Sequence, residues 1–272
     1  MTPLLTLPVH EALHAAARAH AKTLDCSLDL DRSRTTVDLD ETGWQWQGAR
    51  YPFLSVCKPR TIYYWTGTAF EPAARFTSSL IKLVPTEWGT PTFEIDGIKM
   101  LVSEKISPWA DAERKVALIQ PQGKRVLDTC GGLGYFAAWC LQGRASQVLS
   151  FEKNPSVMWL RTLNPWSPAE DERLTLEQGD VAKEIEKLPD ASFDAALHDP
   201  PRFGIAGELY SQAFYDQLAR VVRRKGRLFH YTGSPNKLTS GRDVANEVAG
   251  RLRRAGFSTE VSGDGVVGVK IR

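Results

Sequence analysis

The chain has 272 residues, of which 42% are hydrophobic and 24% are charged, and its formal net charge at pH 7 is +2. These values are ordinary for a globular protein, and the length suffices for one large domain and a smaller one. No apolar run approaches the roughly 20 residues of a membrane span, and the N-terminus lacks the basic and apolar regions of a secretion signal. We therefore expect a cytoplasmic protein without a membrane partner.

Residues 8–22 are rich in alanine and predict an amphipathic helix that contains His10-Glu11-Ala12-Leu13-His14, an H-E-x-x-H sequence typical of zinc proteases. In the metzincin form of that motif a glycine lets the chain leave the helix. Here Ala17 stands at that position and favours a continuing helix, which would carry His20 to another face. Cysteines 26, 57, 130 and 140 show no C-x-x-C spacing either. We expect no metal site and a reducing compartment.

From Ser27 the hydrophobic period changes to two, which is typical of strands with one solvated face. Residues 27–31 and 36–40 predict a hairpin, and a second hairpin of residues 92–95 and 98–101 turns on Asp96-Gly97. Further strands are expected at 43–46, 61–65 and 80–84. Residues 1–104 therefore predict a small N-terminal helix plus antiparallel β module, whose aromatic side chains we expect to pack in its core.

Ser107-Pro108 is an N-cap followed by an N1 proline, and it predicts a helix to about residue 118. Strands and helices then alternate. Strands are expected at 125–128, 147–151, 173–177, 193–197, 227–231, 257–262 and 266–271, with helices at 135–142, 156–163, 181–187, 208–224 and 242–255. Residues 105–272 thus predict an α/β domain with a doubly wound, mostly parallel seven-stranded sheet.

The segment from Arg125 to Pro155 combines a strand ending in Asp128, a loop with three glycines, a helix and a second strand closed by Glu152. Glycines let the backbone approach a ligand, and the helix N-terminus presents free N–H groups. An acid roughly twenty residues further on suits a ribose diol. The segment predicts a nucleoside-binding site, a feature that NAD-dependent enzymes share.

In such a sheet ligands bind beyond the carboxyl ends of the strands. The residues at those ends are therefore the predicted site: Asp128 with the glycine loop, Glu152, Gly179-Asp180, His198-Asp199-Pro200-Pro201 and His230-Tyr231-Thr232.

This set resembles the class I S-adenosylmethionine-dependent methyltransferases, which have a Rossmann-like fold. The resemblance covers about residues 105–272 and implies S-adenosyl-L-methionine as cofactor. It implies that the loop from Asp128 to Gly134 holds the methionine part, Glu152 the ribose hydroxyls and Asp180 the adenine amino group. The cofactor-binding residues so implied are Asp128, Cys130, Gly132, Gly134, Glu152, Lys153, Asp180, Val181 and Asp199.

Five shorter stretches are similar to an uncharacterised family of predicted methyltransferases known mainly from archaeal genomes. They are Lys-Leu-Val-Pro-Thr (82–86), Val-Leu-Asp-Thr-Cys-Gly-Gly-Leu-Gly-Tyr (126–135), Asn-Pro-Trp-Ser (164–167), His-Asp-Pro-Pro-Arg-Phe (198–203) and Gly-Arg-Leu-Phe-His-Tyr (226–231).

Two departures from the class I pattern stand out. Cys130 replaces the first glycine of the loop, so we expect no positive φ there. Arg202 separates the two prolines from Phe203, whereas amino-group methyltransferases usually have the aromatic residue at once. The shifted D-P-P-x-F form occurs among RNA-modifying methyltransferases.

Methyl transfer requires the nucleophile, the methyl group and the sulfur to be held in line, and a proton to be accepted. Because two prolines fix the turn after Asp199, its carboxylate and a backbone carbonyl are predicted to face the acceptor. We assign Asp199 as catalytic, assisted by His198 and His230, although a histidine at a strand end is also commonly a hydrogen-bonded wall residue. The predicted substrate contacts are Pro200, Pro201, Arg202, Phe203 and Tyr231. A cysteine nucleophile is disfavoured.

The predicted function is N-methylation of RNA, either tRNA or rRNA. Two basic runs, at 220–227 and 251–254, add to the D-P-P-x-F pattern in favouring an RNA partner. Three alternatives stay open: a small-molecule methyltransferase, an aminopropyltransferase, and a noncatalytic RNA- or protein-binding module that retains the fold.

Overall fold

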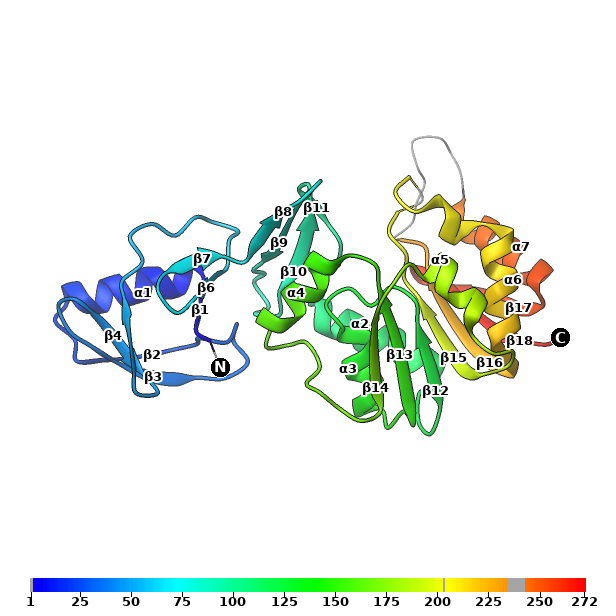
Figure 1. Ribbon diagram of the computed structural model, residues 1–272, viewed down its shortest axis with the longest axis horizontal. Helices are drawn as coiled ribbons and strands as arrows, with labels where there is room; N and C mark the ends of the chain where they lie inside the picture. Colours follow the sequence, from blue (N-terminus) through cyan, green and yellow to red (C-terminus); the bar gives the residue numbers. More distant parts are fainter. Residues whose placement is uncertain (1, 203, 234–242) are drawn as a thin grey trace. The chain divides into compact units, whose positions relative to one another are not determined.

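The structure is a computed structural model that describes residues 2–202, 204–233 and 243–272 (Figure 1). The chain divides into two compact units, the first formed by Met1–Trp109 with Trp159–Ser167 and the second by Ala110–Met158 with Pro168–Arg272. Within the described residues, no helix combines the length and the apolar character that crossing a membrane requires.

The first unit contains helix α1 (Leu7–Arg18) and a small antiparallel β region, as expected from the sequence. Its described strands form three sheets, ordered β1-β6-β7, β2-β3-β4-β5 and β11-β10-β9-β8. The fully buried Trp44 stacks on Tyr51 and Phe70, with ring centroids 4.5 and 6.1 Å apart. The strands are β1 (Leu4–Leu5), β2 (Thr23–Cys26), β3 (Thr35–Leu39), β4 (Gly43–Trp46), β5 (Ala49–Pro52), β6 (Tyr63–Trp65), β7 (Phe70–Pro72), β8 (Ala74–Phe76), β9 (Leu80–Val84), β10 (Thr92–Ile95) and β11 (Ile98–Lys99).

The first hairpin differs from the prediction, because β3 pairs with Thr23–Cys26 and not with residues 27–31. The Asp29 carboxylate accepts the backbone N–H of Ser33 at 2.9 Å, and the Ser27 hydroxyl accepts that of Asp31 at 2.8 Å. Side chains that bond the local backbone compete with sheet pairing, so this stretch forms a compact loop.

Helix α1 is also shorter than predicted, because it ends at Arg18 and His20 adopts a left-handed φ of 52°. The His14 ring bonds the Leu54 carbonyl at 2.9 Å. In the part of the chain that the structure describes, no group of three or more His, Cys, Asp and Glu side chains is placed to hold a metal ion.

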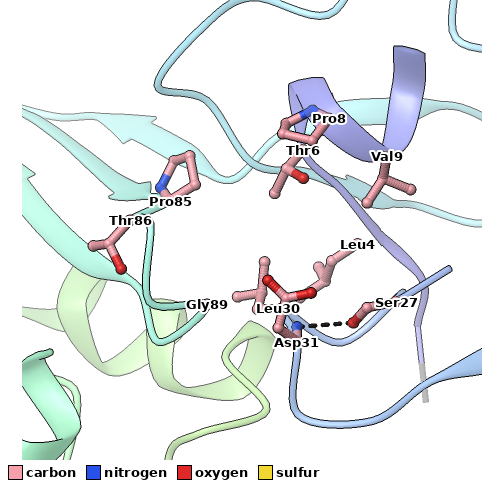
Figure 2. A pocket seen from close by; sticks show the side chains of 10 residues that line it. All are labelled: Leu4, Thr6, Pro8, Val9, Ser27, Leu30, Asp31, Pro85, Thr86 and Gly89. Atoms are coloured by element: carbon pink, nitrogen blue, oxygen red, sulfur yellow. Dashed lines mark hydrogen bonds between the residues drawn. The ribbon is translucent and has the colours of Figure 1, made fainter. Parts of the chain in front are cut away.

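Figure 2 shows a small cavity of the first unit, about 110 Å³ in volume, between the start of α1 and the loop that follows β9. At its wall Gly89 has a φ of +75°, and a Cβ there would lie 2.7 Å from the Cβ of Asp31. The Ser27 hydroxyl, which also lines the cavity, is already bonded to Asp29 and to the Asp31 amide. These polar groups of the cavity wall therefore have partners within the protein.

The second unit has the predicted α/β, Rossmann-like arrangement with a seven-stranded mixed sheet, ordered β14-β13-β12-β15-β16-β18-β17. The first five strands in that order are parallel, and the terminal hairpin of β17 and β18 joins β16 antiparallel. The strands are β12 (Arg125–Asp128), β13 (Gln147–Glu152), β14 (Leu174–Gln178), β15 (Phe193–His198), β16 (Val222–Tyr231), β17 (Phe257–Ser262) and β18 (Gly265–Lys270).

Helix α2 (Pro108–Ile119) precedes β12, and strands of the sheet are connected by α3 (Tyr135–Gln142), α4 (Pro155–Leu163), α5 (Val181–Glu184) and α7 (Val244–Ala255). From β12 the chain proceeds to β13 and β14 on one side and then returns to β15 and β16 on the other. The strand order thus reverses between β12 and β15, which is where open α/β sheets bind their ligands.

The predicted helix 208–224 is divided in the structure. A 3₁₀ turn, η2 (Gly207–Tyr210), is followed by the N-cap Ser211, whose side chain accepts the Phe214 N–H, and by α6 (Gln212–Val221). Strand β16 begins at Val222, five residues earlier than predicted, and its pairing with β15 is irregular between Phe193 and Ala195. Lys225 accommodates this bulge with a φ of 68°.

Candidate active site

The glycine loop follows β12 at the centre of the sheet. Asp128 is fully buried and accepts a hydrogen bond from the Ser150 hydroxyl at 2.8 Å. Gly132 and Gly134 have φ values of 49° and 85°, a conformation that a side chain disfavours. Cys130 does not adopt a positive φ, which confirms the expectation for this position. The loop thus brings bare backbone to the start of α3.

Glu152, the last residue of β13, is hydrogen-bonded to the glycine loop. One of its carboxylate oxygens accepts the Gly132 N–H at 3.0 Å, and the other accepts the Asn154 N–H at 2.8 Å. Both oxygens of the Glu152 carboxylate therefore accept backbone N–H groups, which fixes the carboxylate at the end of β13 beside the glycine loop.

Asp180 lies after β14 and caps the short helix α5, since it accepts the Ala182 N–H at 3.2 Å. The Lys153 ammonium lies 2.9 Å from its other oxygen. Burial alone would raise the pKa of Asp180, but the bonds from Lys153 and Ala182 outweigh it and lower the pKa. Val181, the first residue of α5, is buried beneath. Asp180 is therefore an anionic acceptor at the third strand tip.

Cys130 lies among the carboxylates of three strand tips, because Glu152, Asp128 and Asp199 all act electrostatically on its thiol. Burial raises the pKa of that thiol well above its ordinary value, and the three carboxylates raise it further. The thiol is therefore neutral, which does not suit a nucleophile. The residues at the ends of β12, β13 and β15 are therefore close enough to act on one thiol.

Asp199 follows β15 and pairs with a residue that the sequence reasoning missed. The Lys115 ammonium of α2 lies 3.3 Å from the Asp199 carboxylate and 2.8 Å from that of Asp111. It also lies 3.7 Å from the centre of the Tyr231 ring, a cation–π contact. Tyr231 and Asp199, on neighbouring strands, are thus brought together by a lysine from a third element.

Burial shifts the pKa values of Asp199 and Lys115. The Asp199 side chain is 15% exposed and that of Lys115 only 3%. Burial raises the pKa of Asp199, and the lysine opposes this rise. Burial would lower the pKa of Lys115, but the carboxylates of Asp199 and Asp111 raise it above its ordinary value. Near neutral pH the lysine is therefore a buried cation.

A second cation, Arg114, connects the ion pairs of Lys115 to the turn between β17 and β18. The Arg114 guanidinium bonds Asp111 and Asp264, both at 2.7 Å. The Asp264 backbone carbonyl accepts the Thr232 N–H at 3.0 Å. Three carboxylates and two cations thus surround the ends of β15 and β16, so this region carries little net charge.

His198 is fully buried, and both of its ring nitrogens are bonded within the protein. Nε2 donates to the Leu209 carbonyl at 3.0 Å, because a carbonyl only accepts. Nδ1 then accepts the Thr129 hydroxyl at 2.7 Å. Burial lowers the pKa of His198 to about 4, so the ring is neutral near pH 7.

His230 has the same character. Its Nδ1 donates to the Tyr231 carbonyl at 2.8 Å, and its Nε2 accepts the Tyr215 hydroxyl at 2.9 Å. The ring is fully buried and packs edge-on against His198, with centroids 4.4 Å apart. Burial lowers its pKa well below the ordinary value. The catalytic roles of the two histidines stay predictions, and these contacts favour a wall that supports the strand tips.

The prolines after Asp199 are held from η2, where the Tyr210 hydroxyl donates to the Pro201 carbonyl at 3.2 Å. Pro200 is buried, and the exposed Arg202 accepts the Ile205 N–H at 2.7 Å through its carbonyl. Phe203, one of the predicted substrate contacts, lies outside the described residues.

Most of the basic side chains in the two runs at 220–227 and 251–254 bond other residues of the second unit. Arg220 bonds the carbonyls of Ile185 and Leu188, both at 2.7 Å, and Arg223 pairs with Asp194 at 2.6 Å. Arg251 bonds the Tyr210 carbonyl at 2.5 Å. The run 220–227 also lies at the beginning of β16, at the opposite end of that strand from Tyr231.

Replacing Arg220 with alanine is expected to destabilise the protein by about 1–3 kcal/mol, because buried carbonyl groups lose a charged donor. Replacing the exposed Arg224 of the same run is expected to change stability by less than about 0.5 kcal/mol. Urea unfolding of both variants measures the difference. Equal stabilities would contradict a structural role for Arg220.

The chain is similar to one curated archaeal protein in sequence and to several solved structures in fold. No protein-family model matches the chain. An uncharacterized protein of Methanocaldococcus jannaschii, MJ1233, is 40% identical over 198 residues, which are 72% of this chain and 68% of that protein. Among solved structures, a spermidine synthase in complex with the transition state analogue AdoDATO matches with a TM-score of 0.59 at 17% identity, over 72% of each chain.

The spermidine synthase of Thermotoga maritima matches with a TM-score of 0.56 at 16% identity, over 72% of this chain and 71% of that one. A methyltransferase of Mesorhizobium loti that depends on S-adenosylmethionine matches with a TM-score of 0.42 at 16% identity, over 58% and 95% of the two chains. The spermidine synthases share the fold, and the archaeal relative, at its higher identity, identifies the family. The chain belongs to the family of this uncharacterized Methanocaldococcus jannaschii protein.

Proposed function

We propose that the protein binds S-adenosylmethionine and transfers its methyl group to a nitrogen atom. The observation that carries this proposal is the arrangement at consecutive strand tips: a glycine loop bonded to Glu152, then Asp180, and the half-buried Asp199 after β15. The sulfonium of the bound cofactor supplies an already activated methyl group.

The described residues fit this cofactor. Gly132 and Gly134 keep the backbone free of side chains at positive φ, so the methionine part can approach the loop. Glu152 offers carboxylate oxygens to ribose hydroxyls, and Asp180 is an anionic acceptor for an amino group. Binding at Glu152 would exchange its bond from the Gly132 amide for bonds from the ribose.

Asp199 orients the acceptor and takes its proton. An amino or ring N–H donates to a carboxylate, and Lys115 fixes one carboxylate oxygen of Asp199 at 3.3 Å. The two prolines that follow have no N–H groups, so the turn offers only acceptors to the incoming nitrogen. The low exposure of Asp199 and Lys115 strengthens these electrostatic contacts.

RNA is the acceptor that we propose first. Its support is the D-P-P-x-F sequence at 199–203, since most of the basic run at 220–227 has contacts within the second unit. An RNA base supplies a planar nitrogen that suits a carboxylate and a carbonyl at this turn. Binding of RNA is expected to weaken steeply with salt.

S-Adenosylhomocysteine is expected to raise the melting temperature by several degrees at about 100 times its Kd, a stabilisation of about 2.7 kcal/mol. Gly132→Arg is expected to abolish the shift, because the side chain would fill the loop. Gly48→Arg is the matched control, since Gly48 has a φ of +77° and open space around it in the first unit. Absence of a shift in the wild-type protein would contradict the proposed cofactor.

The acceptor is identified by supplying methyl-labelled S-adenosylmethionine together with fractionated cell extract. We expect the label in RNA, and digestion to nucleosides would show a methylated nitrogen. Label in protein or in small molecules would show that the acceptor is not RNA. Cofactor binding without any transfer would favour a noncatalytic binding module.

Aminopropyl transfer is a second candidate, favoured by the likeness in fold to two spermidine synthases over 72% of the chain. It would use the decarboxylated form of S-adenosylmethionine and a polyamine. Thermal stabilisation by the decarboxylated form and not by S-adenosylmethionine would support this candidate over methyl transfer.

A further inference from the structure

Lys115 lies where the sequence pattern of its helix calls for an apolar residue. Helix α2 buries Ala112, Val116 and Ile119 at intervals of three and four residues, and Lys115 lies buried on the same stripe. A buried lysine is rare unless its charge is paired. Its place on this stripe therefore calls for a reason beyond packing.

Two carboxylates and an aromatic ring contact the Lys115 ammonium. Asp111 of α2 is 2.8 Å away, Asp199 at the end of β15 is 3.3 Å away, and the Tyr231 ring of β16 is 3.7 Å away. The other charged groups nearby are Arg114 and Asp264, which bond each other at 2.7 Å. The Lys115 ammonium thus occupies the position between carboxylates and an aromatic ring where an alkylammonium substrate would bind.

We infer that Lys115 is a positioning residue that determines acceptor specificity, because its ammonium holds Asp199 toward the acceptor and excludes cationic amines from the site. This inference rests on the proposed methyl transfer and names its substrate class. The acceptor nitrogen is uncharged, as in a nucleobase or an amide-like group. Aliphatic polyamines are rejected, since like charges in a poorly solvated site repel each other.

The experiment compares amine binding by the wild-type protein and by Lys115→Gln, which keeps most of the side-chain length without the charge. Putrescine is titrated by calorimetry into each protein, both alone and saturated with S-adenosylhomocysteine. We expect putrescine to bind Lys115→Gln at least tenfold more tightly than the wild-type protein, because Asp199 and Asp111 lose their cation. Lys115→Arg is expected to restore the exclusion.

Lys187→Gln controls for the change in net charge, since the Lys187 side chain is 70% exposed on the surface of the same unit. This variant is expected to bind putrescine no more tightly than the wild-type protein. A gain in Lys187→Gln equal to that in Lys115→Gln would overturn the inference.

The wild-type protein provides a further test that does not depend on the folding of any variant. Wild-type protein that binds putrescine with a submillimolar Kd, or that transfers methyl label to it, would overturn the inference. Failure of S-adenosylhomocysteine to bind would overturn the proposed function instead. The titrations without S-adenosylhomocysteine still report on Lys115 in that case, so the two failures are distinguishable.

Discussion

Replacing Asp199 with asparagine is expected to slow methyl transfer by at least about 100-fold, the usual contribution of a positioned proton acceptor. Asparagine preserves the shape of the side chain but removes its negative charge, so it can neither take a proton nor attract an N–H donor as strongly. The rate is measured with methyl-labelled S-adenosylmethionine and the acceptor fraction that the labelling experiment identifies.

The affinity of Asp199→Asn for S-adenosylhomocysteine is the control, and we expect it to stay within about twofold of the wild-type value. Asp216→Asn is the matched variant, because Asp216 lies on α6 and bonds only Gln212 among the described contacts. It is expected to retain full activity. An Asp199→Asn protein that transfers label at the wild-type rate would show that the acceptor binds elsewhere.

Lowering the pH from 6.5 to 4 is expected to reduce the free energy of unfolding of the second unit by about 3 kcal/mol through His198 alone. The unfolded chain binds a proton on this ring near pH 6.5, whereas the folded protein does so only near pH 4. Stability is therefore fully present above pH 6.5 and is lost as the pH falls. Burial lowers the pKa of His230 as well, which adds to the loss.

Hydrogen exchange of β15 and β16 amides, followed between pH 7 and pH 4.5, measures this slope in the second unit. His198→Gln keeps a donor toward the Leu209 carbonyl but does not titrate, so its slope is expected to be shallower by about one proton. His20→Gln, at an exposed position after α1, is the matched control and is expected to leave the slope unchanged. A wild-type slope no steeper than that of His198→Gln would contradict the assigned contacts.

The elements that the sequence predicted best are those with strong local signals. Helix α3 spans Tyr135–Gln142 as expected, because glycines bound it on both sides, and β10 and β11 form the hairpin that Asp96-Gly97 predicts. The limits predicted for the helix at 208–224 were wrong. The helical spacing of apolar residues extends across 207–221 and does not mark the ends of the helix. Those ends are set by the capping bond of Ser211 and by the pairing of Val222 with Phe193.

The site residues stay predictions, but the structure shows which of their contacts could be expected from the sequence. Glu152 and Asp180 lie at strand ends as expected, because a carboxylate after a strand is a local signal. Lys115 was missed, since its partners Asp199 and Tyr231 are distant in sequence and meet it only through packing. The available signal was a lysine on the apolar stripe of Ala112, Val116 and Ile119.

The turn after Asp199 is anchored at both of its ends. The Tyr210 hydroxyl bonds the Pro201 carbonyl, and the His198 ring bonds the Leu209 carbonyl. The intervening segment can therefore change in sequence and length during evolution without moving Asp199, and doubling the length of a flexible loop adds only about 0.6 kcal/mol of closure entropy. If Asp199 has the role proposed above, exchange of this one short segment would alter the acceptor and leave that role unchanged.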